Sequence, residues 1–219
     1  MQLLWHLTTY LSCGGKGKIM ITAIGDVMRE AYKRGWITTR DGNISLRRKG
    51  SDLIYITPSG WRKTIIHPEH MVKVKLTPAG VNLQGDVKPS GELSMHSMIQ
   101  RYRKRTTAVV HLHPTYTVAA MYAGINLQEL AQDFPELGRY TKVAPSVPVL
   151  PVTSHELAIA TFSALAGKER LLGSPLLYDI VGQASHGVCA IANNPWDAFE
   201  HIERLEHICQ IALASGKHK

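Results

Sequence analysis

The chain has 219 residues, of which 44% are hydrophobic and 19% are charged, and its formal net charge is +8. A chain of this length can enclose a full hydrophobic core without splitting, so we predict one globular domain. No apolar run is long enough to cross a membrane, which argues against a membrane-spanning protein. The three cysteines form no Cys-x-x-Cys pattern, which argues against a disulfide framework or thiolate zinc site and favours a reducing cytoplasm.

The excess of basic residues is compatible with a nucleic acid, an acidic membrane surface or an anionic substrate as the partner. The densest basic cluster lies where a helix that begins near Ser90 should end, and it comprises Arg101, Arg103, Lys104 and Arg105. Cations at that end of a helix complement its dipole, which explains the cluster without a ligand. We therefore expect neither nucleic acid nor membrane as a partner, and an anionic substrate remains.

The first nineteen residues contain scattered leucines, but no basic residue precedes them and no convincing cleavage site follows. Residues 14–18 are rich in glycine and lysine, which is typical of a flexible linker. We therefore expect residues 1–19 to be a poorly ordered appendage and residues 20–219 to form the single domain.

Periodicity predicts the elements in chain order. Apolar spacing predicts a helix from Ile21 to about Gly35, a second helix from Ser90, and a C-terminal helix with Asn194 as its cap and Pro195 at its first position. In that last helix an apolar stripe from Trp196 to Leu213 should pack in the core. Alternating or apolar runs with short turns between them, typical of an antiparallel sheet, predict strands at residues 42–47, 53–57, 71–76, 108–114, 177–180 and 187–191.

The strand at 108–114 carries His111 and His113, two residues apart. In a strand this spacing places both imidazoles on one face, so one metal ion can bind a nitrogen of each. Glu92 and His186 can complete a set of three imidazoles and one carboxylate, which suits zinc or another divalent metal. A lone histidine on an apolar face is more often a hydrogen-bonded core residue, but the pair favours a metal site. The pattern alone does not name a reaction.

Three short turns offer backbone N–H and hydroxyl donors to an anion: Gly42-Asn43, Ser59-Gly60 and Ser90-Gly91. The last should lie at the positive N-terminus of the second helix, where anions are stabilised. Chain reversal is a sufficient explanation for any one of these turns. Their interest lies in their occurrence together with the histidines.

Five motifs occur in order over most of residues 20–219, and they are Asp41-Gly42-Asn43-Ile44-Ser45, Ile56-Thr57-Pro58-Ser59-Gly60, Pro89-Ser90-Gly91-Glu92, His111-Leu112-His113 and Ser185-His186-Gly187. Together they resemble the class II aldolase/adducin family, and within it the zinc-dependent L-fuculose-1-phosphate aldolase group. The resemblance implies an α/β/α sandwich with a central, mainly antiparallel sheet. It also implies a homotetramer with active sites between neighbouring subunits.

The resemblance also assigns roles to individual residues. His111, His113 and His186 would bind zinc, with Glu92 as a ligand of the resting metal and as the group that moves a proton. The substrate phosphate would be held by Gly42, Asn43, Ser59, Gly60, Ser90 and Gly91. The implied reaction is the reversible cleavage of a ketose 1-phosphate, such as L-fuculose 1-phosphate, to dihydroxyacetone phosphate and a small aldehyde. Tyr140 is our candidate for a tyrosine that stabilises the departing aldehyde oxygen.

Some features keep other reactions open. Gly91 stands where the aldolase pattern has a second phosphate-binding serine, so one hydroxyl is lost. Pentulose-phosphate 4-epimerases carry aspartate at the position of Glu92. The glutamate in this chain therefore favours the aldolase over the epimerase. Methylthioribulose-1-phosphate dehydratases share a lead-in like Lys88-Pro89-Ser90, and 3-oxo-tetronate 4-phosphate decarboxylases are also similar. A non-catalytic adducin-like module has no need of four convergent ligands. His96, one helical turn after Glu92, should support the site or pack.

Overall fold

The computed structural model describes residues 15–102, 107–167 and 176–217. Its helices are α1 (Gly15–Lys33), α2 (Leu93–Tyr102), α3 (Thr115–Tyr122), α4 (Leu127–Gln132), α5 (Pro135–Tyr140), α6 (His155–Ala166) and α7 (Pro195–Ser215), with short 3-10 helices at Lys63–Ile65 and Pro68–His70. Its strands are β1 (Asn43–Arg47), β2 (Leu53–Ile56), β3 (Val72–Thr77), β4 (Gly80–Leu83), β5 (Thr107–Leu112), β6 (Ile180–Gln183) and β7 (Gly187–Ala192).

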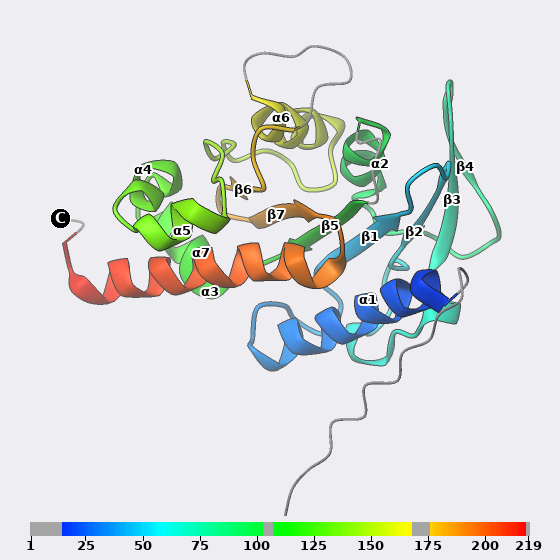
Figure 1. The fold of residues 1–219 in the computed structure, drawn as a ribbon, viewed down its shortest axis with the longest axis horizontal. Coiled ribbons are helices and arrows are strands. Elements are labelled where there is room, and N and C mark those ends of the chain that lie inside the picture. Colours follow the sequence, from blue (N-terminus) through cyan, green and yellow to red (C-terminus); the bar gives the residue numbers. More distant parts are fainter. Residues whose placement is uncertain (1–14, 103–106, 168–175, 218–219) are drawn as a thin grey trace, which may run out of the picture.

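The seven strands form one sheet in the order β4-β3-β2-β1-β5-β7-β6, and every neighbouring pair is antiparallel. Helices α1 and α7 cover one face of this sheet, and α2 and α6 cover the other (Figure 1). The expected α/β/α sandwich with an antiparallel sheet is therefore confirmed.

The side chains of β5 divide between the two faces because alternate residues of a strand point in opposite directions. Ala108, Val110 and Leu112 join the core beneath α1 and α7. Val109 joins the second core, beneath α2 and α6. His111 follows Val109 by two residues, so the predicted metal-binding face is the one that α2 covers.

Helix α7 follows the sequence pattern closely. Asn194 Oδ1 accepts a hydrogen bond of 2.9 Å from the backbone N–H of Asp197, and Pro195 is the first helical residue. The predicted apolar stripe is buried from Phe199 to Ile208, but Trp196 is 39% exposed and was wrongly assigned to the core. Its ring lies beside Phe199, with centroids 5.6 Å apart.

Three predicted boundaries are wrong. Helix α1 begins at Gly15, so residues 15–18 are helical and not a linker, while residues 1–14 lie outside the described part. Helix α2 begins at Leu93 rather than Ser90, because Ser90 N–H pairs with Thr57 O at 3.0 Å and so belongs to a turn beside β2. The sixth strand is Ile180–Gln183 and not residues 177–180.

The basic cluster after α2 is described only in part, since residues 103–106 lie outside the described ranges. Arg101, in the last turn of α2, donates a hydrogen bond of 2.5 Å to Thr77 O and another to Gly80 O. These carbonyls belong to the β3–β4 hairpin. Arg101 therefore has structural partners in the β3–β4 hairpin.

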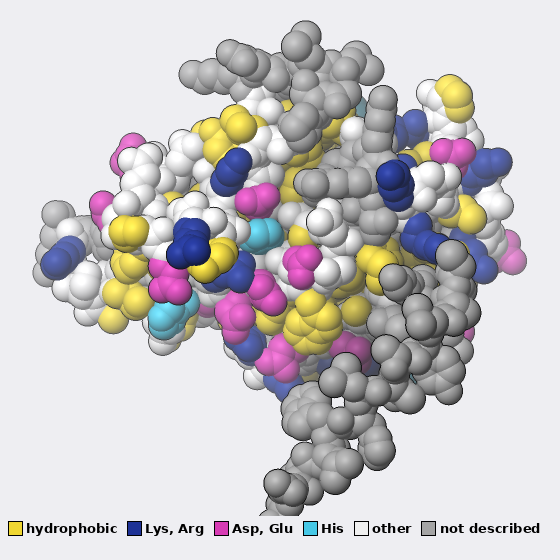
Figure 2. All heavy atoms as spheres, viewed as in Figure 1, with side chains coloured by type: hydrophobic (Ala, Val, Ile, Leu, Met, Phe, Trp, Pro, Cys, Tyr) yellow, Lys and Arg dark blue, Asp and Glu magenta, His cyan; other side chains and the backbone are white. Residues whose placement is uncertain are grey.

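The surface over α7 mixes charges of both signs (Figure 2). Arg34 pairs with Glu203 at 2.5 Å, and Arg204 pairs with Glu200 at 2.7 Å. Among the described helices, none is long and apolar enough to cross a membrane.

Replacement of Asn194 by alanine should lower the free energy of unfolding by about 1 kcal/mol, because the first turn of α7 loses its side-chain acceptor. Chemical denaturation of the wild type and of Asn194→Ala measures this difference. Asn193→Ala is the matched control, since this exposed side chain lies one residue before the cap. Equal stability of Asn194→Ala and the wild type would contradict the capping role.

Candidate metal centre and substrate cavity

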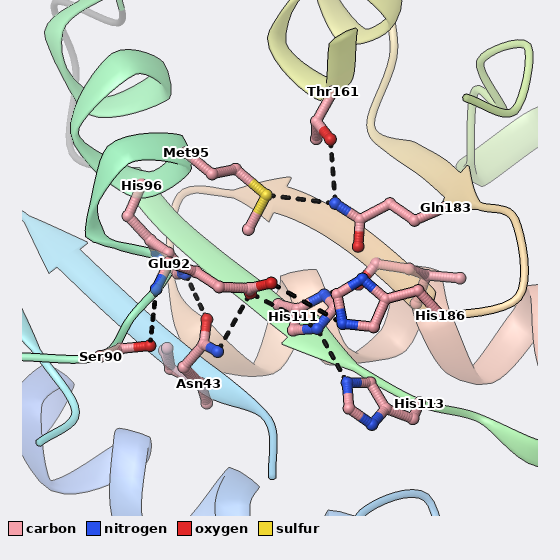
Figure 3. Close-up of polar contacts among 12 residues, drawn as sticks. Asn43, Ser90, Glu92, Met95, His96, His111, His113, Thr161, Gln183 and His186 are labelled. Atoms are coloured by element: carbon pink, nitrogen blue, oxygen red, sulfur yellow. Dashed lines mark hydrogen bonds and ion pairs between the residues drawn. The ribbon is translucent and has the colours of Figure 1, made fainter. Parts of the chain in front are cut away.

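Three histidines converge beside the sheet (Figure 3). His111 is on β5, His113 follows the end of that strand, and His186 lies in the turn between β6 and β7. The Nε2 atoms of His111 and His113 are 2.9 Å apart, and one nitrogen from each of the three rings lies within 4.8 Å of the others. Tetrahedral zinc with bonds of 2.0 to 2.1 Å holds its ligands about 3.4 Å apart. The spacing is therefore close to what one ion requires.

The protonation of these rings also suits a metal. His111 Nδ1 donates a hydrogen bond of 3.0 Å to Val188 O, which leaves the lone pair of Nε2 facing the other histidines. Burial, followed by the neighbouring imidazoles, lowers the pKa of His111 well below its usual value, and burial also lowers the pKa of His113. Both rings are thus neutral at pH 7, the form that binds a cation.

His186 retains an unused polar atom. Its Nδ1 is buried and has no hydrogen-bond partner among the described residues. Such orphaned buried groups are rare in folded proteins unless a ligand or ion completes the site. Three convergent imidazoles and one orphaned nitrogen therefore fit a borderline divalent cation such as zinc.

The glycine after His186 is required by close packing of two strands. A Cβ atom on Gly187 would lie 2.4 Å from Leu112 O and 2.7 Å from a ring carbon of His113. Any side chain here would push β7 away from β5 and separate the histidines. The His-Gly motif is thus a consequence of the geometry of the centre.

Glu92 is 6% exposed and supplies the carboxylate. Its Oε2 lies 3.4 Å from His111 Nε2, and its Oε1 lies 3.8 Å from His186 Nε2. Oε2 also accepts a hydrogen bond of 3.1 Å from Asn43 Nδ2. Glu92 is therefore within reach of an ion held by the three imidazoles, as predicted.

The cavity in front of these groups has a volume of about 180 Å³. The structure brings ten of the eleven predicted site residues to its wall: Gly42, Asn43, Ser59, Gly60, Ser90, Gly91, Glu92, His111, His113 and His186. The second and third anion turns are held together by a backbone hydrogen bond of 2.9 Å from Ser59 N–H to Lys88 O. Gly42, at φ 69°, and Gly60, at φ 71°, adopt the left-handed conformation that favours glycine.

Other cavity residues were missed from the sequence, and Lys63 is the most consequential. It is only 2% exposed, and burial lowers its pKa. Its Nζ donates hydrogen bonds of 3.3 Å to Pro58 O and to Trp61 O, one on each side of the Ser59-Gly60 turn. No pattern marks a lysine in a short polar segment as buried. The other missed residues that line the cavity are Arg40, Asp41, Pro58, Val152 and Thr153.

Tyr140 is the predicted site residue that the structure does not bring to the cavity. It is 49% exposed at the end of α5, and its ring lies 5.4 Å from the guanidinium carbon of Arg204. The hollow that it lines includes His201 and is a different one. His201 is partly buried, and its Nδ1 pairs with Thr141 Oγ1 at 2.9 Å.

Comparison with known proteins finds a matching family and several relatives of the chain. The family model of the class II aldolase and adducin N-terminal domain matches residues 22–213. A 5-deoxy-D-ribulose 1-phosphate aldolase of Bacillus thuringiensis serovar kurstaki is 31% identical over 170 residues, which are 78% of this chain and 73% of that protein. A methylthioribulose-1-phosphate dehydratase of Granulibacter bethesdensis is 32% identical over 188 residues, which are 82% of this chain and 84% of that protein.

A solved structure shows the same fold. That of an L-fuculose-1-phosphate aldolase from Thermus thermophilus has a TM-score of 0.67 and 24% identity, and the match covers 90% of this chain and 95% of that chain. At this identity the structural likeness supports the architecture rather than the reaction. The sequence match over residues 22–213 does more, and it shows that the chain belongs to the class II aldolase and adducin family.

Proposed function

We propose that this protein is a metal-dependent aldolase that reversibly cleaves a ketose 1-phosphate, of the L-fuculose 1-phosphate type, to dihydroxyacetone phosphate and a small aldehyde. The observation that carries the proposal is the placement of three imidazoles, a buried carboxylate and three turns that offer donors to an anion around one cavity. The names of relatives, a sugar-phosphate aldolase among them, support a phosphorylated sugar as substrate.

A divalent ion, zinc in the first instance, would be held by His111, His113 and His186 and would stabilise negative charge on the substrate oxygens as a Lewis acid. The N–H groups and hydroxyls of the three turns bind the phosphate. The ammonium of Lys63 lies beneath the second turn and adds positive charge there. Glu92 takes or returns the proton on the carbon of dihydroxyacetone phosphate that forms the new bond.

A dehydratase is the second candidate, because a methylthioribulose-1-phosphate dehydratase is about as similar to the chain as the aldolase. It needs the same parts: a phosphate site, a metal and a carboxylate that moves a proton. A 3-oxo-tetronate 4-phosphate decarboxylase or a pentulose-phosphate 4-epimerase would use them too. The products distinguish these reactions.

Assembly and location also belong to the proposal. Tyr140 lies outside the cavity of its own chain, so its predicted role requires a homotetramer in which a neighbouring subunit brings it to the site. The buried free thiols of Cys189 and Cys209 suit a reducing cytoplasm.

The purified protein should release dihydroxyacetone phosphate from L-fuculose 1-phosphate, and a chelator should abolish the release until zinc is returned. A coupled reduction of dihydroxyacetone phosphate follows the reaction. Parallel assays with methylthioribulose 1-phosphate, a 3-oxo-tetronate 4-phosphate and a pentulose 5-phosphate serve as the comparison. Turnover confined to one of these other substrates would contradict the aldolase and identify the alternative.

The variant His113→Ala should lose bound metal and activity while the fold is retained, because two imidazoles and a carboxylate hold the ion less well. Metal analysis and circular dichroism measure the two properties. His207→Ala, an exposed histidine on α7, should keep both. If His113→Ala keeps its metal, the ligand set is wrong.

The variant Glu92→Gln should still bind metal through the imidazoles but should lose about 10²- to 10⁴-fold in kcat, the usual contribution of a general acid–base. The amide keeps the size of the side chain but cannot accept the proton. Metal content measured on the same sample separates this loss from loss of the ion. Wild-type kcat in Glu92→Gln would assign proton transfer to another group.

A further inference from the structure

Behind Glu92 a chain of hydrogen bonds runs into the protein, away from the cavity. Asn43 donates to Glu92 Oε2, and Asn43 Oδ1 pairs with His96 Nε2 at 2.5 Å (Figure 3). His96 Nδ1 pairs with Ser45 Oγ at 2.7 Å. Ser45 Oγ accepts a hydrogen bond of 3.0 Å from Gln100 Nε2, which also donates to Thr107 O at 3.0 Å. Ser45, His96 and Gln100 are 0% exposed.

The spacing of these residues explains how two elements form one chain. Asn43 and Ser45 are two residues apart on β1, so they share a face of the sheet. His96 and Gln100 are four residues apart on α2, and Glu92 precedes His96 by the same interval, so the three lie on one side of the helix. The two rows of side chains alternate along the contact between α2 and β1.

From Gln100 to Glu92, each hydrogen bond in this chain is donated toward the cavity. A carbonyl only accepts, so Gln100 Nε2 must donate to Thr107 O, and its other N–H serves Ser45. The Ser45 hydroxyl then donates to His96 Nδ1. Because Nδ1 accepts this proton, the proton of the His96 ring lies on Nε2, which donates to Asn43 Oδ1.

Reversing the hydrogen bonds between Ser45, His96 and Asn43 would be unfavourable both at Ser45 and at Asn43. If His96 Nδ1 donated to Ser45, the buried Ser45 hydroxyl would have no acceptor among its contacts in the described chain. Asn43 would then turn its oxygen toward the Glu92 carboxylate, so that two acceptors would face each other. A buried polar group without a hydrogen-bond partner destabilises the folded state. The direction toward the cavity is therefore strongly preferred.

We infer that His96 is a positioning residue: it holds the amide of Asn43 with its N–H groups toward the cavity, so that one of them fixes the Glu92 carboxylate beside the histidines. This inference rests on the proposed function and adds a second role for Asn43. That residue was expected to bind phosphate, yet its oxygen and one N–H are already engaged with His96 and Glu92. Its second side-chain N–H remains for substrate.

A double-mutant cycle on His96→Phe and Asn43→Ala tests the inference, with zinc alone as the probe. Competition with a chromophoric chelator measures zinc affinity. Each single variant should weaken zinc binding by about 10- to 100-fold, the usual effect of losing a group that orients a ligand. Because His96 acts through Asn43, the double variant should bind zinc as Asn43→Ala alone does. The same pattern is expected in kcat.

A conservative variant and a control separate positioning from packing. His96→Gln places an N–H near the position of Nε2 and should recover most of the lost affinity. Thr117→Val removes a buried hydrogen bond of 2.8 Å to Glu206 elsewhere in the fold, so it should lower stability but leave zinc affinity unchanged. Ser45→Ala replaces His96→Phe in the cycle if the latter does not fold.

Additive losses in the cycle, or wild-type zinc affinity in His96→Phe, would overturn the inference while the proposed function stands. An equal loss of affinity in Thr117→Val would also overturn it, since a general loss of stability would then explain the effect. A wild-type protein that binds no zinc would overturn the proposed metal centre and this inference together.

Discussion

The register of β5 between β1 and β7 is the constraint on which the site depends. Asn43 pairs with His111 on one side of the strand, and Cys189 pairs with His111 on the other. This pairing places the Gly42-Asn43 turn, at the start of β1, and the His186-Gly187 turn, at the start of β7, at the same end of β5. A slip of one residue would turn His111 to the opposite face of the sheet, beneath α7. Glycine is needed at position 187 to maintain this register, because any side chain there would collide with β5.

Burial then sets the chemistry of the groups that the register brings together. Imidazoles removed from water lose their protons, which makes them ligands rather than cations. A buried carboxylate needs donors, and Asn43 supplies one to Glu92. One small cavity is thus lined by a carboxylate, imidazole nitrogens and the buried side chain of Lys63. The hydrogen-bonded chain through His96 continues from Glu92 into the space between α2 and β1.

Several features could be predicted from the sequence because they depend on local spacing. The spacing of His111 and His113 was sufficient to predict that their rings lie together, since side chains two residues apart in a strand point to the same face. The cap at Asn194 and the buried stripe of α7 follow from contacts within one helix. The antiparallel sheet was predictable from short alternating runs with tight turns. Ten of the eleven predicted site residues could be found because they stand in ordered motifs that resemble a known family.

Other features depend on contacts between segments far apart in the chain, and local patterns do not encode them. Lys63 is buried because the turn that it supports packs beside the cavity, although its own segment is polar. Tyr140 could not be placed, since only the packing of α5 against α7 decides where its ring lies. The direction of the hydrogen bonds from Gln100 to Glu92 likewise needs the register of α2 on β1. The sequence by itself therefore determined which groups are the candidates for the chemistry, through short-range periodicity and motif order. Only the tertiary structure decided how they are protonated, oriented and supported, because burial and hydrogen-bond partners come from distant parts of the chain.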